Sequence, residues 1–139
     1  MTDIIAIVED DHKIAEGLRG ILSDVGIKSI LFDNGLTFLS SYKAHDFSSL
    51  LLDIRLPGVS GIQVFKKLRQ DGYTVPIIFM SGHADVAIAV DLMKHGAIDI
   101  ITKPFRIQEV MEPIQESIQQ HHRHLKASQE QAQYSNKTT

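Results

Sequence analysis

The sequence predicts a single α/β domain with a five-stranded parallel sheet and helices on both of its faces. Short apolar runs alternate along the chain with segments whose apolar residues recur at helical spacing. The runs are continuous and rich in β-branched residues, which is typical of strands buried on both faces of a parallel sheet. Strand–helix–strand units of this length favour right-handed crossovers. The 139 residues are enough for one domain with a sizeable core.

Five strands are expected, one from each short apolar run. The first run, Ile4-Ile5-Ala6-Ile7-Val8, is the clearest, and the second is weaker. Ser48 and Ser49 stand at the start of the third strand, and Pro76 opens the fourth. The predicted strands are residues 4–8, 27–32, 50–52, 77–80 and 98–102.

Helical spacing predicts a helix after each strand. Gly26 and Gly96 stand where a glycine ends a helix, and Asn34 can cap the second helix. The loop Pro57-Gly58-Val59-Ser60-Gly61 precedes the third helix, and the last helix begins near Ile107. The apolar residues that mark the first four helices are Ile14, Leu18, Ile21, Leu22 and Val25, then Leu36, Phe38 and Leu39, then Ile62, Phe65 and Leu68, then Val86, Val90 and Met93.

The last helix runs into a polar tail, for which two interpretations stay open. From about Gln115 the composition shifts to Gln, His, Ser and Lys, and disorder is expected after about Ala127. Spacings of four and three still define a heptad seam whose apolar character declines toward the C-terminus. In one interpretation the helix docks on its own domain up to Ile118 and then frays; in the other it pairs with another chain. The seam consists of Ile107, Met111, Ile114, Ile118, His121, Leu125, Ser128 and Ala132.

Two further features of this helix bear on its shape and chemistry. Pro113 lacks an N–H and its ring clashes with the preceding turn, so it should bend the axis. His121, His122 and His124 suggest a metal site, but the polar, glutamine-rich context makes this interpretation the weaker one.

Composition and charge exclude several classes of protein. A net charge of −3 is too small to indicate wholesale binding to nucleic acid or anionic membranes. The absence of cysteine excludes a disulfide framework and thiolate chemistry. The start, Met1-Thr2-Asp3, lacks the basic segment of a signal peptide, and no apolar run approaches the ~20 residues of a membrane-spanning helix. We therefore expect a cytoplasmic protein that contacts neither nucleic acid nor membrane directly.

Polar residues end four of the apolar runs, and in a parallel sheet these ends open onto one edge, where ligands bind. The four ends are Glu9-Asp10-Asp11, Asp53, Ser81 and Lys103-Pro104. Two carboxylates about 4 Å apart repel by roughly 1 kcal/mol in water and about 4 kcal/mol at an effective dielectric near 20. A fold that gathers them needs compensating cations. Lys103 can supply one, and Mg²⁺, which takes carboxylate and phosphate oxygens, can supply another.

Each of these residues has a functional and a simpler interpretation. Asp11 is better placed to cap the helix that follows it than to bind a ligand. Asp53 ends an apolar strand alone and can act as a nucleophile that forms an aspartyl-phosphate. Lys103 suits a phosphate, although it can also be an ordinary strand-end cation, and it precedes Pro104 in a candidate cis peptide. The Ser81 hydroxyl can bond a phosphoryl oxygen, although serines are common at strand ends.

Together these motifs resemble the receiver domain of bacterial two-component response regulators, the family of the chemotaxis protein CheY. The resemblance covers about residues 3–120 and is greatest to receivers of the FixJ and NtrC types. It implies a flavodoxin-like (βα)5 three-layer sandwich with strand order 2-1-3-4-5. It rests on Val-Glu-Asp-Asp, Leu-Asp-Ile-Arg-Leu-Pro-Gly-Val-Ser-Gly, Met-Ser-Gly-His and Thr-Lys-Pro-Phe.

The resemblance also implies a role for each site residue. Asp53 would accept the phosphoryl group, which Ser81 would bond and Lys103 would neutralise. Asp10, Asp53 and the backbone carbonyl of Arg55 would ligate Mg²⁺, with Glu9 acting on the metal, often through water. The modulating positions would be Arg55, Gly82, His83, Ile100 and Pro104.

Ile100 departs from the family pattern. The family often has a tyrosine or phenylalanine here, whose ring turns inward when the hydroxyl residue moves to the phosphate. An isoleucine cannot hydrogen-bond, so we expect the conformational coupling to run through the loop after Ser81 instead.

The resulting expectation is a phosphorylation switch. Residues 1–122 would form the receiver and residues 123–139 a polar tail or linker, helical at first and then disordered. The chain would accept its phosphoryl group from a sensor histidine kinase and assist its own phosphorylation and dephosphorylation without being an enzyme. It would control a partner or an effector domain after residue 139, with transcription as one output, and would form homodimers through the fourth helix, fifth strand and fifth helix.

Three alternatives stay open. The chain can be a receiver that binds partners without being phosphorylated. A phosphohydrolase with an aspartate nucleophile usually needs a second acid two residues on, where this chain has Arg55. A flavodoxin-like cofactor binder would need a phosphate loop after the first strand, and the run Glu9-Asp10-Asp11 would repel a phosphate there.

Overall fold

The structure is a computed structural model that describes residues 2–137, with side chains described to residue 131. Five strands alternate with five α-helices, as the apolar runs predict. The strands are β1 (Ile4–Val8), β2 (Lys28–Phe32), β3 (Ser49–Asp53), β4 (Ile77–Ser81) and β5 (Asp99–Thr102). The helices are α1 (His12–Asp24), α2 (Gly35–Ser41), α3 (Gly61–Gln70), α4 (Val86–Lys94) and α5 (Ile107–Lys137), with short 3₁₀ helices η1 (Tyr42–Ala44) and η2 (His83–Asp85).

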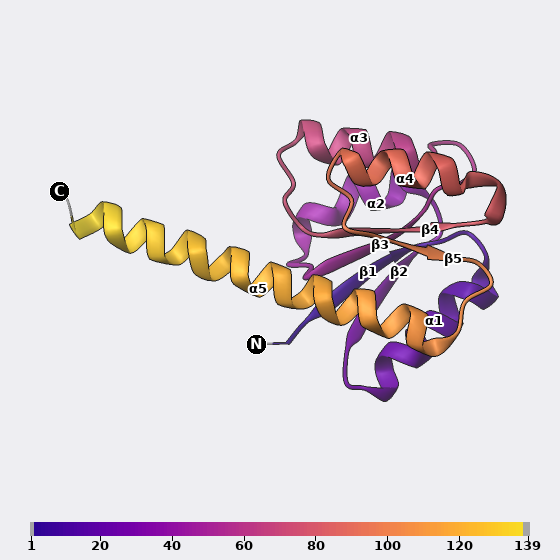
Figure 1. Cartoon of the computed structure of the whole chain (residues 1–139), viewed down its shortest axis with the longest axis horizontal. Helices are drawn as coiled ribbons and strands as arrows, with labels where there is room; N and C mark the ends of the chain where they lie inside the picture. Colours follow the sequence, from indigo (N-terminus) through magenta and orange to yellow (C-terminus); the bar gives the residue numbers. More distant parts are fainter. Residues whose placement is uncertain (1, 138–139) are drawn as a thin grey trace.

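All five strands pair in parallel in the order β2-β1-β3-β4-β5, so the predicted fold class and strand order are confirmed. The sheet is the middle of three layers: α2, α3 and α4 cover one face, and α1 and α5 cover the other (Figure 1). Successive residues of β1 point to opposite faces, so Ala6 and Val8 join one core while Ile5 and Ile7 join the other. This is why the first apolar run is continuous.

Local signals in the sequence set several of the element ends. Gly26 and Gly96 follow α1 and α4 with φ of 79° and 109°, a conformation that glycine adopts without strain. Asn34 caps α2 by accepting a hydrogen bond from the Thr37 amide. Helix α3 begins with a capping box that was not predicted, in which Ser60 and Gln63 exchange side-chain and backbone hydrogen bonds.

Helix α5 differs from the prediction for the tail. It continues as one helix through Pro113 to Lys137 (Figure 1), so the disorder expected after about Ala127 does not appear over the described residues. The segment holds no glycine or further proline, and Gln, Glu, Lys and Ala favour helix. Residues 138–139 lie outside the described residues, and the division of the chain at residue 122 remains a prediction.

The heptad seam of α5 serves mainly to dock the helix on its own domain. Ile114 and Ile118 are buried, and docking extends past the predicted end at Ile118 to His121, which is also buried. Beside them Ser117 donates a hydrogen bond to Ser49, and His122 lies 2.8 Å from Asp3. The middle of the seam is therefore not available to a second chain, whereas Ile107 and Ser128 are exposed. Within residues 2–137, no helix combines the length and the apolar character needed to cross a membrane.

Gly61 fixes the position of the loop that carries the end of β3. It begins α3, and its amide donates to the Ile54 carbonyl at 2.9 Å. A Cβ at this position would lie 2.0 Å from the carbonyl oxygen of Asp53 and 2.9 Å from the Cα of Ile54. Only glycine lets α3 approach the strand end so closely.

Gly61→Ala should therefore destabilise the domain, because the backbone around Asp53 must move, and overpacking of this kind costs about 1–3 kcal/mol. Urea unfolding measures the change. Gly17→Ala is the matched control: Gly17 lies in α1 with nothing within 4 Å of its added Cβ, so it should gain up to about 1 kcal/mol from helix propensity. If both variants unfold at the same urea concentration, the close packing of α3 on the strand end is refuted.

Candidate functional site

The carboxyl ends of β1, β3, β4 and β5 bring the predicted polar residues to one edge of the sheet. Asp53 and Ser81 are the last residues of β3 and β4, and Glu9 and Lys103 directly follow β1 and β5. Adjacent strands end in step, with Val8 opposite Leu52. The Lys103 amide extends the last ladder by donating to the Ser81 carbonyl at 2.7 Å.

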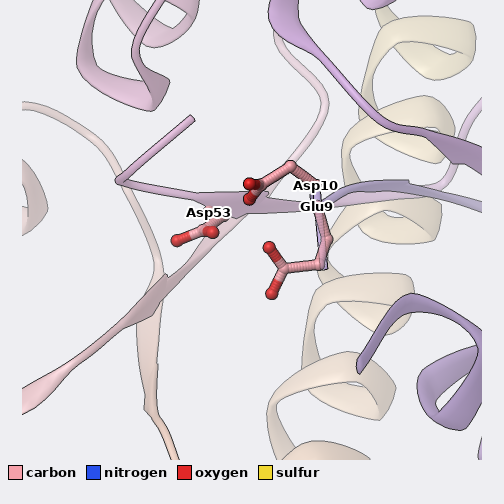
Figure 2. A group of neighbouring side chains, drawn as sticks. All are labelled: Glu9, Asp10 and Asp53. Atoms are coloured by element: carbon pink, nitrogen blue, oxygen red, sulfur yellow. The ribbon is translucent and has the colours of Figure 1, made fainter. Parts of the chain in front are cut away.

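Three carboxylates meet at this edge. One oxygen each from Glu9, Asp10 and Asp53 lies within 4.8 Å of the others, and Figure 2 shows the three side chains gathered at the ends of β1 and β3. Glu9 and Asp53 are only 2% and 5% exposed, whereas Asp10 is exposed to solvent. The site is thus a buried acidic pair with a third carboxylate at its rim.

Lys103 supplies the positive charge that this cluster needs. Its Nζ lies 3.1 Å from Oδ2 of Asp53 and also forms an ion pair with Glu9. Burial acts to lower the pKa of Lys103, but the hydrogen bond to Glu9 and the charge of Asp53 outweigh it and raise that pKa. The ammonium is therefore held charged between the two buried carboxylates.

One lysine does not satisfy the cluster completely. Burial and the neighbouring Asp53 carboxylate raise the pKa of Glu9 to about 8, against the opposing effect of Lys103. Oε2 of Glu9 is buried without a hydrogen-bond partner in the described structure. A buried, unpaired oxygen in a group of three acids can be satisfied by a proton or by a further cation, and these three residues could hold a metal ion.

The donor set fits Mg²⁺. All candidate ligands are oxygens, which a hard divalent cation prefers, and one or two carboxylates plus water and phosphate oxygens are its usual environment. Asp10 is exposed to solvent, and Oε2 of Glu9 is buried without a hydrogen-bond partner in the described structure. Asp11, by contrast, accepts hydrogen bonds from the amides of Lys13 and Ile14, so its predicted role as the cap of α1 is confirmed.

Ser81 and the two residues after it line the β4 side of the site. Ser81 is fully buried, and its hydroxyl donates a hydrogen bond to the Gly82 carbonyl at 2.8 Å. Gly82 is the N-cap of η2, and His83, the first residue of η2, is exposed. The hydroxyl that was expected to meet a phosphoryl group therefore has another partner in this conformation.

Arg55 contacts the site through its backbone and a second loop through its side chain. Its amide donates to Oδ1 of Asp53 at 3.2 Å. Its guanidinium forms two hydrogen bonds with the carboxylate of Asp85, Nε to Oδ2 at 2.7 Å and Nη2 to Oδ1 at 2.8 Å. Asp85 was not predicted to have a role, because no periodicity in the sequence reveals a pair of residues that meet across two loops.

The remaining predicted positions lie around this centre. The Lys103–Pro104 peptide bond is cis, as predicted, and Pro104 is exposed. Ile100 is partly buried and packs against the apolar core that α2, α3 and α4 share with the sheet. In this conformation Ile100 is a packing residue.

The sequence model of the response regulator receiver domain matches residues 5–115. The response regulator protein TmoT of Ectopseudomonas mendocina is 37% identical over 115 residues, which are 83% of this chain and 52% of that protein. The transcriptional regulatory protein FixJ of Bradyrhizobium diazoefficiens is 34% identical over 116 residues, 84% of this chain and 57% of its own length.

Solved structures agree with these relatives. The response regulator StyR has a TM-score of 0.86 at 32% identity, covering 98% of this chain and 69% of that one. Full-length FixJ from B. japonicum has a TM-score of 0.84 at 32% identity, covering 91% of this chain and 63% of that one. The chain spans about half the length of the curated relatives it matches first. It belongs to the response regulator receiver domains of two-component systems, a family of signalling domains.

Proposed function

We propose that this receiver domain accepts a phosphoryl group on Asp53 from the phosphohistidine of a sensor kinase. The observation that carries the proposal is the environment of Asp53, a buried carboxylate that ends a strand beside Lys103 and two further acids. In the transfer, the N–P bond of the phosphohistidine breaks and its electron pair returns to the imidazole. A bond forms between a carboxylate oxygen of Asp53 and phosphorus.

The residues around Asp53 would act by position and charge, which provide most of the catalysis in phosphoryl transfer. Lys103 would stay paired with the acceptor carboxylate and neutralise the incoming phosphoryl oxygens. Glu9, Asp10, Asp53 and the Arg55 carbonyl would hold Mg²⁺, which when bound offsets the negative charge of carboxylates and phosphoryl oxygens. Ser81 would exchange the Gly82 carbonyl for a phosphoryl oxygen.

The output would lie beyond this chain. FixJ is a transcriptional regulatory protein, NtrC of Escherichia coli is a DNA-binding transcriptional regulator, and this chain covers 57% and 24% of their lengths. We assign residues 1–122 to the receiver and residues 123–139 to a connecting segment or tail, and we propose that the receiver controls a partner protein or an effector domain. Gly82, His83 and Pro104 would modulate the lifetime of the phosphoryl group, including its loss by self-catalysed hydrolysis.

Asp53 should gain one phosphoryl group from acetyl phosphate when Mg²⁺ is present and none when it is chelated. Intact-mass spectrometry reads the added mass and its lability in acid. Lys103→Ala should keep the fold and lose signalling, because the charge that neutralises the phosphoryl group is gone. Asp24→Asn, an exposed substitution in α1, is the matched control and should react as the wild type does. Equal phosphorylation of Asp53→Asn would show that another residue is the acceptor.

Phosphorylation should also promote homodimers through the face formed by α4, β5 and α5. This face exposes large apolar side chains, and such patches mark interaction sites; they are Val86, Val90, Met93 and Ile107, between 36% and 61% exposed. Light scattering after size exclusion, with beryllofluoride and Mg²⁺ as the phosphoryl mimic, should show the mass rise toward that of a dimer. Val90→Glu should prevent the rise, and an unchanged wild-type mass would remove the dimer from the proposal.

A further inference from the structure

The ion pair of Arg55 and Asp85 connects the loop after β3 to the start of α4. The carboxylate of Asp85 is nearly buried, at 5% exposed, whereas the Arg55 side chain is 75% exposed. Both oxygens of Asp85 accept from the guanidinium, in the two-bond geometry that arginine forms best. The loop that follows Ser81 is therefore tied to a residue that lies two positions after Asp53.

Asp85 has a second potential partner that it does not use. It is the N-cap residue of α4, a position where aspartate usually accepts hydrogen bonds from first-turn amides. Here its side chain makes no such bond: both carboxylate oxygens face Arg55, and the Asp85 backbone, with φ of −108° and ψ of 7°, would have to become extended before the side chain could cap the helix. The start of α4 is thus left without the side-chain cap that its own sequence supplies.

Arg55 also has a potential second partner. Its amide already donates to Oδ1 of Asp53, so the residue lies directly beside the proposed acceptor. A phosphoryl group carries about −1.5 to −2 charge and three strong acceptor oxygens, and a guanidinium binds phosphate with the same two-bond geometry as a carboxylate. Phosphorylation would place a competing anion near the exposed side chain of Arg55.

We propose that Asp85 is a positioning residue that holds Arg55 away from the acceptor site, and that phosphorylation of Asp53 exchanges the partners of both residues. Arg55 turns to the phosphoryl group, and the released Asp85 caps α4. This inference rests on the proposed phosphorylation of Asp53 and adds the link from that event to α4. Ile100 offers no aromatic ring or hydroxyl for such a link.

The energetics of the pair suit a switch. Arg55 is largely exposed, and the first-turn amides of α4 would replace it as donors to the buried carboxylate of Asp85, so the two arrangements can lie close in free energy. A phosphoryl group that binds Arg55 in only one arrangement then shifts the population toward it. The shift reaches the surface directly, because α4 carries Val86, Ile88 and Val90, which are 36%, 42% and 47% exposed.

Three variants separate the ion pair from the cap. Asp85→Asn keeps an oxygen that caps a helix as well as aspartate does, but loses the charged pair. Arg55→Met frees Asp85 and leaves it intact. Asp85→Ala removes both the pair and the cap. Asp91→Asn, an exposed charge removal within α4, is the matched control.

The readout is the backbone amide spectrum of residues 83–95 in the full chain, without phosphorylation and with beryllofluoride and Mg²⁺. In the unphosphorylated Asp85→Asn and Arg55→Met variants, the amide peaks should lie part of the way along the line that joins the peaks of the free wild type to those of the beryllofluoride-bound wild type. The amide peaks of Asp85→Ala should be displaced less far along this line, and those of Asp91→Asn should not be displaced along it. Arg55→Met keeps the test valid if the Asp85 variants fail to fold.

Intact-mass measurement of Asp53 phosphorylation in the same samples separates the two levels of the account. If the wild type takes no phosphoryl group, the proposed function fails and the exchange fails with it. If the wild type is phosphorylated while Asp85→Asn and Arg55→Met keep the free wild-type spectrum, only the exchange is overturned. Equal displacement of Asp85→Asn and Asp85→Ala would overturn the capping by Asp85.

Discussion

The structure depends on the repulsion among carboxylates that the sheet brings to one edge. Glu9, Asp10 and Asp53 offer oxygens within 4.8 Å of one another, and two of these residues are buried. Such a cluster is unfavourable unless cations compensate it. Lys103 provides one, from a strand end on the opposite side of Asp53, and the three carboxylates could hold a metal ion as another. The unfavourable charge is thus concentrated around Asp53, the residue proposed to accept a phosphoryl group.

The parallel sheet is what makes that arrangement possible. Strands that run the same way deliver their last residues to the same edge, so residues far apart in sequence meet without any long loop. The backbone then holds them: the Lys103 amide bonds to the Ser81 carbonyl, and Gly61 lets α3 pack against the Asp53 carbonyl. A change of charge at Asp53 therefore acts directly on the ends of β4 and β5 and on the start of α3.

Much of this could be predicted from the sequence, and the reasons are physical. A strand buried on both faces has to be continuously apolar, so the apolar runs predicted the bounds of the strands to within a residue or two. The polar residues that end four of these runs predicted which side chains gather at the edge of the sheet. The pair of Arg55 and Asp85 could not be predicted, because it depends on how two loops curve toward each other. The capping box at Ser60 and Gln63 was visible in the sequence, as a serine followed three residues later by a glutamine. The extent of α5, which is described as a helix to Lys137, could not be predicted, because a polar composition indicates exposure, and an exposed segment rich in good helix formers can still be helical.

The measurement that tests this account most directly is thermal unfolding of the chain from pH 5 to pH 8.5, with and without Mg²⁺. Burial and the neighbouring Asp53 carboxylate raise the pKa of Glu9 from the usual 4.5 to about 8 in the folded state, against the opposing effect of Lys103. The unfolded state thus binds fewer protons between these values, and without metal the stability should fall as pH rises through this window. Mg²⁺ competes with that proton, so ~10 mM Mg²⁺ at a Kd of about 1 mM should add about 1.4 kcal/mol at pH 8 and less at pH 5. Glu9→Gln should flatten the pH dependence, and Asp10→Ala should remove most of the response to Mg²⁺. A wild-type melting temperature that Mg²⁺ leaves unchanged at every pH would contradict the account.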